Sequence, residues 1–188
     1  MKGQHTRAQY VDAAVLLFQR DGYHGVGLSK LIAESGAPKG SFYFHFPGGK
    51  EELALAAIAK SDADVQILIE GAAHAAPDAP TFVRYLGKGL KQWLIASNFS
   101  AGCPVGTMTL ELGASMPLIA ESCRLAYHSW TRMIADAFDR YALPSDTVAA
   151  KATALVAMLE GAVILCRAEK SSKGIDDCVS VFVALLEV

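Results

Sequence analysis

Residues 28–46 read LSKLIAESGAPKGSFYFHF, and they decide the fold that this sequence predicts. A short helix fits Leu28–Glu34, and the glycine at position 36 ends it. A second short helix fits Pro38–His45, because proline is accepted in a first helical turn. The following Phe46-Pro47-Gly48-Gly49 cannot continue a helix. Two short helices joined by so tight a turn form a helix-turn-helix.

An earlier helix completes a small bundle around this motif. It fits Thr6–Arg20, where Thr6 is an N-cap residue and Gly22 follows as a stop. The apolar residues of this helix share one face, and they are Val11, Ala14, Val15 and Phe18. Residues 1–49 are therefore predicted to form a three-helix bundle that carries the helix-turn-helix.

The rest of the chain is also predicted to be helical. No alternation of period two is sustained, and apolar residues recur at spacings of three and four. Further helices fit Lys50–Glu70, Val105–Ala114, Pro117–Tyr141, Ser145–Lys170 and Ile175–Leu186. Another helix ends near Ser97, and either Asp78 or Thr81 could cap its start. We predict an all-α protein of about nine helices, with a second helical domain over residues 50–188.

Charge is unevenly distributed along the 188 residues. The formal net charge is −2, but residues 1–50 hold six lysines and arginines against three acidic residues, a balance of +3. Residues 51–188 therefore carry −5. A basic segment joined to a more acidic one places any surface that faces a polyanion in the first part of the chain.

Composition indicates a folded protein without a membrane segment. Hydrophobic residues make up 52% of the chain and charged residues 19%, which is too hydrophobic for a disordered chain. The most apolar stretch, Ala152–Cys166, contains Glu160 and is shorter than the ~20 residues that cross a bilayer. No apolar signal segment follows Met1. We therefore predict a cytoplasmic protein with no membrane partner.

No catalytic, metal or cofactor site is predicted. Cys123 and His128 are five residues apart on one helix and do not share a face, so they form no metal site with Glu111 and Glu121. Ser129 beside His128 is no nucleophile and base pair, because adjacent helical residues point about 100° apart. The chain has no phosphate-binding glycine loop and no GxSxG elbow, and its four cysteines form no CxxC pair. An enzyme is not expected.

The second helix of the motif carries groups that suit DNA. Such a helix can enter the major groove. Its N-terminal end and outer face offer cationic and hydroxyl donors, namely Lys39, Ser41, Tyr43, His45 and Lys50. Gly40 lets the backbone approach phosphate closely, and Phe42, Phe44 and Phe46 can anchor the helix to its bundle. From spacing alone, a helical subdomain that does not recognise DNA is an equal alternative.

The motif also resembles a known family. Gly22-Tyr23, the run Leu31–Phe46 and Lys50-Glu51-Glu52-Leu53 resemble the N-terminal signature of TetR/AcrR-type transcriptional repressors, nearly continuously over residues 6–55. This resemblance implies that Pro38–His45 is a recognition helix. It implies positions near bases and phosphates for Lys39, Gly40 and Ser41, and on phosphates for Tyr43, His45 and Lys50.

A second, shorter resemblance is to the LmrA/YxaF-like branch of that family. It rests on the turn Gly36–Ser41, on the additional glycine in Phe46–Lys50 and on Gly102-Cys103-Pro104-Val105-Gly106.

Two positions depart from the family pattern. Val26 stands where the family often has threonine or serine, so Gly27 must contact DNA through its backbone alone. Phe44 stands where many members have histidine or tryptophan, which leaves the set of base contacts open.

The resemblance implies an effector-binding and dimerising domain over residues 50–188. Aromatic and methionine side chains with few charges suit an adaptable pocket for a small hydrophobic effector, preferentially an aromatic one. The candidates are Trp93, Met108, Leu112, Tyr127, Trp130, Met133, Ile134 and Met158. The alternative for each residue is that it fills the core.

The last two helices carry more apolar surface than one chain can cover. Ser145–Lys170 is apolar around much of its circumference, and Ile175–Leu186 has an apolar stripe. A second copy would complete an intermolecular four-helix bundle through Leu155, Leu159, Val163, Val179, Phe182 and Leu186. The alternative is that the ninth helix covers the eighth within one chain.

The sequence thus predicts a homodimeric, ligand-responsive transcriptional repressor. It would bind a near-palindromic operator in double-stranded DNA and be released by its effector. The alternative is a small-molecule binding or carrier protein without DNA recognition. Salt-dependent binding to DNA from its own upstream region distinguishes the two.

Overall fold

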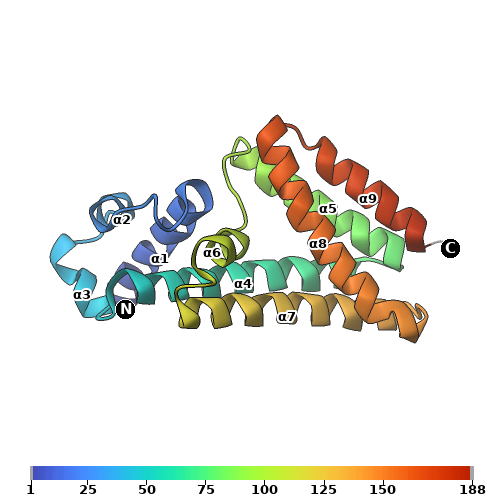
Figure 1. Ribbon diagram of the computed structural model, residues 1–188, viewed down its shortest axis with the longest axis horizontal. Helices are drawn as coiled ribbons and strands as arrows, with labels where there is room; N and C mark the ends of the chain where they lie inside the picture. The colour runs from blue at the N-terminus through green and yellow to red at the C-terminus, as the bar shows by residue number, and fades with distance from the viewer. Residues whose placement is uncertain (1, 187–188) are drawn as a thin grey trace. The chain divides into compact units, whose positions relative to one another are not determined.

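The computed structural model describes residues 2–186, with side chains from residue 4 onward. Within this range it contains nine α-helices and one short 3-10 helix, and no strand (Figure 1). The expected all-α fold of about nine helices is confirmed. Met1, Glu187 and Val188, which the predicted domain ranges include, lie outside the described residues.

The chain divides into two compact units. Unit 1 comprises Met1–Ala63 and Cys103–Ala126, and unit 2 comprises Asp64–Gly102 and Tyr127–Val188. Two long helices contribute residues to both units, α4 (Gly49–Ala75) and α7 (Pro117–Arg140). The functional division predicted at residues 49 and 50 stays a prediction.

Unit 1 contains the helix-turn-helix. Its own elements are α1 (Lys2–Asp21), α2 (Leu28–Ser35), the 3-10 helix η1 (Lys39–Ser41), α3 (Phe42–His45) and α6 (Pro104–Leu112). The α1 helix packs against both α2 and α6. The fully buried large side chains at its centre include Tyr10, Leu17, Phe18, Leu31, Phe42 and Phe46. These residues come from α1, from α2 and from the segment 38–46 that contains α3, so they hold the three helices of the motif together.

The bounds of α2 match the prediction to within one residue, whereas α1 begins earlier than predicted. α2 ends as predicted at Gly36, whose φ of 63° is left-handed and whose N–H donates to the carbonyl of Ala33. α1 begins at Lys2 rather than at the predicted N-cap Thr6. The four preceding residues contain no proline, so the helix extends through Thr6 instead of starting there.

Unit 2 is built from α5 (Ala79–Ala96), α8 (Ser145–Glu169) and α9 (Lys173–Leu186), together with parts of α4 and α7. All three of its own helices pack against one another. One core cluster joins α5 to the last two helices through Leu94, Ala162, Val163, Cys166 and Ile175. A second consists of aromatic rings, where Phe138 meets Phe82 edge-on and stacks on Phe182. The ninth helix therefore covers the eighth within one protomer.

Several helix ends differ from the prediction. α4 continues five residues beyond Glu70, because Gly71 is followed by alanines that favour helix, and Pro77 comes only after the end. Of the two predicted caps of α5, Asp78 is the one observed, and its side chain accepts the Thr81 N–H at 2.7 Å. α6 begins with Pro104 in its first turn, and α9 begins at Lys173.

The helix α8 has the length and composition of a membrane span. Ala152–Cys166 alone is too short, but the whole helix has 25 residues and its most apolar window has a mean hydropathy of 1.8. Core helices of soluble proteins meet the same criteria. In α8, 33% of that window is buried inside the protein, including Leu155, Ala162 and Val163.

Candidate functional site

The segment predicted as a single helix over Pro38–His45 consists of two pieces, η1 and α3. Pro38 is extended and lies before them. Its carbonyl accepts the N–H of Ser41 at 2.9 Å and the hydroxyl of Ser41 at 2.8 Å. Because the serine hydroxyl competes with a helical N–H for this carbonyl, the first turn adopts the tighter 3-10 form.

Aromatic residues attach this recognition segment to α1. Phe42 and Phe46, four residues apart, are fully buried. Both rings meet the ring of Tyr10 edge-on, at centroid distances of 5.3 and 6.0 Å. The Tyr10 hydroxyl also donates to the Pro38 carbonyl at 2.8 Å. Sequence reasoning missed this residue, whose one signal was its position four residues before Ala14, on the apolar face of α1.

The outer side of the segment presents residues predicted for DNA binding. Lys39, Gly40 and Tyr43 are exposed. Ser41 and His45 are half-buried, and the Ser41 hydroxyl already donates to a backbone carbonyl. The polar groups that face solvent most openly are therefore the Lys39 ammonium and the Tyr43 hydroxyl.

At the start of α2, Gly27 can contact DNA only through its backbone. Gly27 is the N-cap residue of this helix, exposed and extended with φ −78°, and it makes no side-chain hydrogen bond. The predicted DNA contact of Gly27 through its backbone stays a prediction.

The cations of unit 1 differ in how they are held. Arg20 and Lys30 both pair with Asp21, at 2.9 and 2.8 Å, and the hydrogen bonds from these cations lower the pKa of the Asp21 carboxyl. Arg7 instead lies over the ring of Phe46, 5.0 Å from its centroid. Arg7 is thus a cation beside the recognition segment, which motif-based reasoning did not select.

Lys50 contacts the turn between α1 and α2. Its ammonium donates to the Tyr23 carbonyl at 2.6 Å and lies 3.9 Å from the centroid of the Tyr23 ring. Burial lowers the pKa of Lys50, while the negative charge of Glu111 acts in the opposite direction. The predicted role of Lys50 as a phosphate donor stays a prediction, and the structure gives the side chain a structural task in addition.

Glu111 of α6 holds the same turn. Its carboxylate accepts the N–H of His24 at 2.9 Å and the N–H of Tyr23 at 3.3 Å. Gly22 has φ +73°, and a Cβ at this position would lie 2.0 Å from one Glu111 oxygen. The carboxylate therefore fits only because residue 22 is glycine. Spacing alone could not pair residues so far apart in sequence.

We expect Glu111→Ala to lower the free energy of unfolding by about 1–3 kcal/mol, because two backbone N–H groups lose a charged acceptor. Urea unfolding followed by circular dichroism measures this loss. The matched control is Glu121→Ala, since Glu121 pairs with Arg124 on the exposed face of α7, and such surface pairs contribute roughly 0–1 kcal/mol. Equal losses in both variants would show that Glu111 does not stabilise the turn.

The eight residues predicted for the effector differ in burial. Met108, Leu112, Trp130 and Ile134 are buried, and Trp93, Tyr127, Met133 and Met158 are half-buried. Met108 and Leu112 belong to unit 1 and the other six to unit 2. Their assignment to an effector site stays a prediction.

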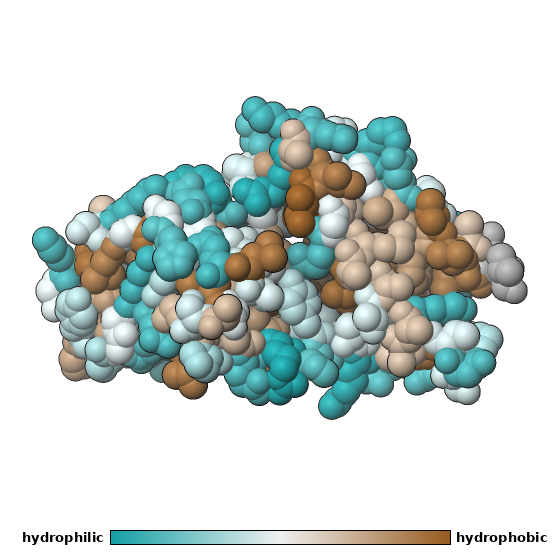
Figure 2. All heavy atoms as spheres, viewed as in Figure 1, coloured by the Kyte–Doolittle hydropathy of each residue, from teal (hydrophilic) through white to brown (hydrophobic). Residues whose placement is uncertain are grey.

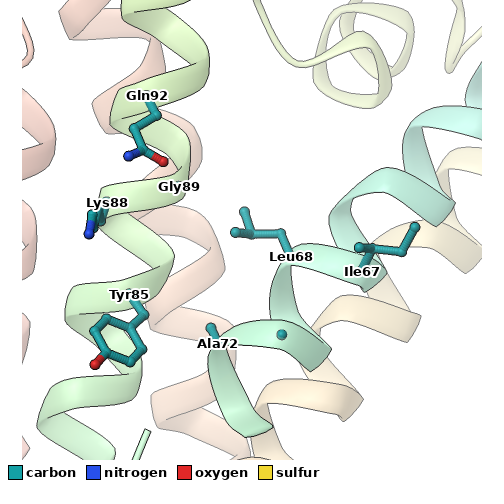
Figure 3. Close-up of a pocket in the computed structure, with 8 residues that line it drawn as sticks. Ile67, Leu68, Ala72, Tyr85, Lys88, Gly89 and Gln92 are labelled. Atoms are coloured by element: carbon teal, nitrogen blue, oxygen red, sulfur yellow. The ribbon is translucent and has the colours of Figure 1, made fainter. Parts of the chain in front are cut away.

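A groove of about 420 Å³ lies between α4 and α5 in unit 2. Figure 3 shows Leu68 and Ala72 of α4 opposite Tyr85, Lys88 and Gln92 of α5. The groove is mainly apolar, and its lining residues with polar side-chain groups are Tyr85, Lys88 and Gln92. None of the eight predicted effector residues lines it.

The predicted dimer residues require correction. Leu155, Leu159, Val163 and Phe182 are buried within one protomer, and Val179 and Leu186 are half-buried. The four buried residues are covered by their own chain and are not free to meet a second copy. The predicted dimer role of Val179 and Leu186 stays a prediction. The exposed large apolar residues of the last two helices are Ile164, Leu165, Val181 and Leu185. Figure 2 shows apolar atoms, in brown and tan, gathered over α8 and α9.

Among the described residues, no group of three or more histidine, cysteine, aspartate or glutamate side chains is placed to hold a metal ion. The four cysteines are free thiols, two of them buried.

Comparison with known proteins identifies the architecture. The model for "Bacterial regulatory proteins, tetR family" matches residues 11–57, and the model for "Transcriptional regulator LmrA/YxaF-like, C-terminal domain" matches residues 80–180. The HTH-type transcriptional regulator LmrA of Bacillus subtilis is 32% identical over 167 residues, which cover 89% of each chain. The chain belongs to the TetR family. This TetR-family protein is a transcriptional regulator and not an enzyme.

Other similar proteins support this family assignment. The uncharacterized regulator YxaF of Bacillus subtilis is 29% identical and covers 85% of this chain and 84% of its own length. A regulatory protein TetR from Rhodobacter sphaeroides superposes with a TM-score of 0.86 at 25% identity, over 94% of this chain and 96% of that one. A TetR regulator from Chloroflexus aurantiacus, with a TM-score of 0.85 at 24% identity over 97% and 94% of the two chains, shares the fold.

Proposed function

We propose that this TetR-family regulator is a ligand-responsive repressor that binds a near-palindromic DNA operator as a homodimer. The observation that carries the proposal is the recognition segment, which is anchored by two buried phenylalanines and exposes Lys39, Gly40 and Tyr43. A cation and a hydroxyl on a rigid outer face suit phosphate contacts. A Cβ at Gly40 would meet nothing within 4 Å, so internal packing does not require this glycine, whereas close approach to DNA does.

We place the dimer contact on the exposed apolar residues of α8 and α9. Two such faces related by twofold symmetry would form a four-helix bundle. The same symmetry would present two recognition segments to the two halves of a palindrome. We accordingly propose that this DNA-binding regulator acts in the cytoplasm.

We further propose that a small apolar effector reduces the affinity for DNA. The groove between α4 and α5 supports an effector site, and Lys88 among its lining residues favours a molecule with an acidic or hydrogen-bonding group. Glu111 ties α6 to the turn before α2, so a shift of α6 would reach the motif. The effector lowers the affinity for DNA only if it binds more tightly to the conformation that does not fit the operator than to the conformation that does.

Binding to DNA from the protein's own upstream region tests the proposal. Affinity should fall at least about tenfold between about 50 and 200 mM salt, the slope expected when one Lys39 from each protomer neutralises one phosphate. A protein that binds apolar compounds but no DNA would instead be a carrier. Loss of DNA binding on adding apolar compounds with an acidic group tests the effector.

We expect Tyr43→Phe to lower operator affinity roughly thirtyfold at unchanged salt slope, because each protomer loses about 1 kcal/mol of hydrogen bonding but no charge. Fluorescence anisotropy titrations at several salt concentrations measure both quantities. Tyr85→Phe is the matched control, since Tyr85 is also exposed but lies on α5. Equal affinity of Tyr43→Phe and wild type would remove this hydroxyl from the DNA contacts.

A further inference from the structure

Phe44 is an apolar side chain that the fold of unit 1 does not use. It is 81% exposed, although Phe42 and Phe46 on either side of it are fully buried. These two residues, four apart, face α1 and complete the packing of the recognition segment, so Phe44 points away from the core. The expectation that all three phenylalanines anchor the helix is therefore wrong for Phe44.

Its ring is positioned by a neighbour. The rings of Phe44 and His45 meet edge-on with centroids 5.0 Å apart, and His45 is itself half-buried with its ring 6.3 Å from that of Tyr10. An aromatic ring has few rotatable bonds, so fixing it in a complex costs little entropy. The structure therefore presents an exposed apolar ring beside the exposed Tyr43.

The chemistry of this surface is selective. Phenylalanine offers no hydrogen-bond donor or acceptor, so it cannot match the polar pattern of guanine, cytosine or adenine edges. In the major groove the one apolar group on a base edge is the C5-methyl of thymine. Phosphates, in contrast, suit Lys39 and Tyr43 nearby.

We infer that Phe44 is a specificity-determining residue that reads thymine methyl groups in the operator. The inference rests on the proposed function, because it requires the recognition segment to enter the major groove. Each protomer would hold one thymine methyl against the Phe44 ring and exclude water from it. The operator should therefore carry a thymine at matching positions of its two halves.

Replacement of thymine by deoxyuridine tests this contact, because it removes the methyl group and leaves base pairing unchanged. An operator is first selected from random duplexes with the wild-type protein, and each thymine is then replaced in turn. At one position of each half, the replacement should lower wild-type affinity about fourfold, the effect of one buried methyl, and about fifteenfold when both halves are changed.

Phe44→Ala should bind the thymine and deoxyuridine operators equally, and Phe44→Leu should keep part of the difference. Leu110→Ala is the control, since Leu110 is 82% exposed on α6 and should keep the full difference. Thermal melting of Phe44→Ala should match wild type, because the side chain is outside the core. A wild-type protein that binds its selected operator with no effect of deoxyuridine at any position would overturn the inference. So would an undiminished effect in Phe44→Ala. Absence of any sequence-selective binding by the wild type would overturn the proposed function itself.

Discussion

Ile164→Asp is expected to convert the protein to a monomer and to abolish operator binding. Ile164 is 60% exposed on α8, next to Leu165, and faces away from the covered side of the helix. In the proposed dimer this position is desolvated against the partner, where an unpaired carboxylate costs several kcal/mol. A monomer offers only one recognition segment, so it loses the second half of the operator contact. Analytical ultracentrifugation and DNA titration measure the two effects.

Ile67→Asp is the matched control for this experiment. Ile67 is 67% exposed, carries the same side chain and lies on α4 instead of the last two helices. We expect it to stay dimeric and to bind the operator. Both single variants should keep their helical circular dichroism, because neither residue is in the core. An Ile164→Asp protein that sediments as a dimer would place the interface on another surface.

Trp130→Ala is expected to cause the second large effect, a loss of about 3–5 kcal/mol in the free energy of unfolding. Trp130 is only 3% exposed, and its ring meets that of Tyr127 edge-on at 5.1 Å. Truncation removes buried contacts and leaves a cavity, which for a chain of 188 residues corresponds to a fall in Tm of roughly 6–20 °C. Stability, effector binding and DNA binding should therefore decline together.

Two comparisons distinguish a role of Trp130 in core packing from a direct role in effector binding. Trp93→Ala deletes the same side chain at a half-buried position of α5, so its loss of stability should be smaller. All measurements use one protein concentration, because unfolding of a dimer depends on it. A Trp130→Ala protein with the wild-type Tm but no response to effector would instead show that Trp130 lines a ligand cavity.

Local sequence was sufficient for the helix-turn-helix. The end of α2 at Gly36 and the burial of Phe42 depend on residues within one or two turns, where backbone preferences and apolar spacing act directly. The family signature over the same stretch added the expected function. For this reason the fold and the position of the recognition segment could be predicted from the amino-acid sequence.

Sequence determined less about the site within that segment. Lys39 and Tyr43 are exposed as expected, but the Ser41 hydroxyl is bound to the Pro38 carbonyl and Phe44 is exposed. In a helix of four residues, apolar spacing does not predict well which side chains face outward. A shift of one residue in the preceding turn is enough to change them.

Only the tertiary structure decided how distant residues are paired and which face of α8 is free. Glu111 meets the N–H groups of Tyr23 and His24 across more than eighty residues, and Lys50 meets Tyr23 across 27. On α8 both faces are apolar, so its composition predicted burial on each of them alike. Packing of α9 and α5 against Val163 covered one face and left Ile164 on the other. The hydrophobic effect is non-directional, so a helix with two apolar faces could bury either of them. The packing of the neighbouring helices decides which face is buried.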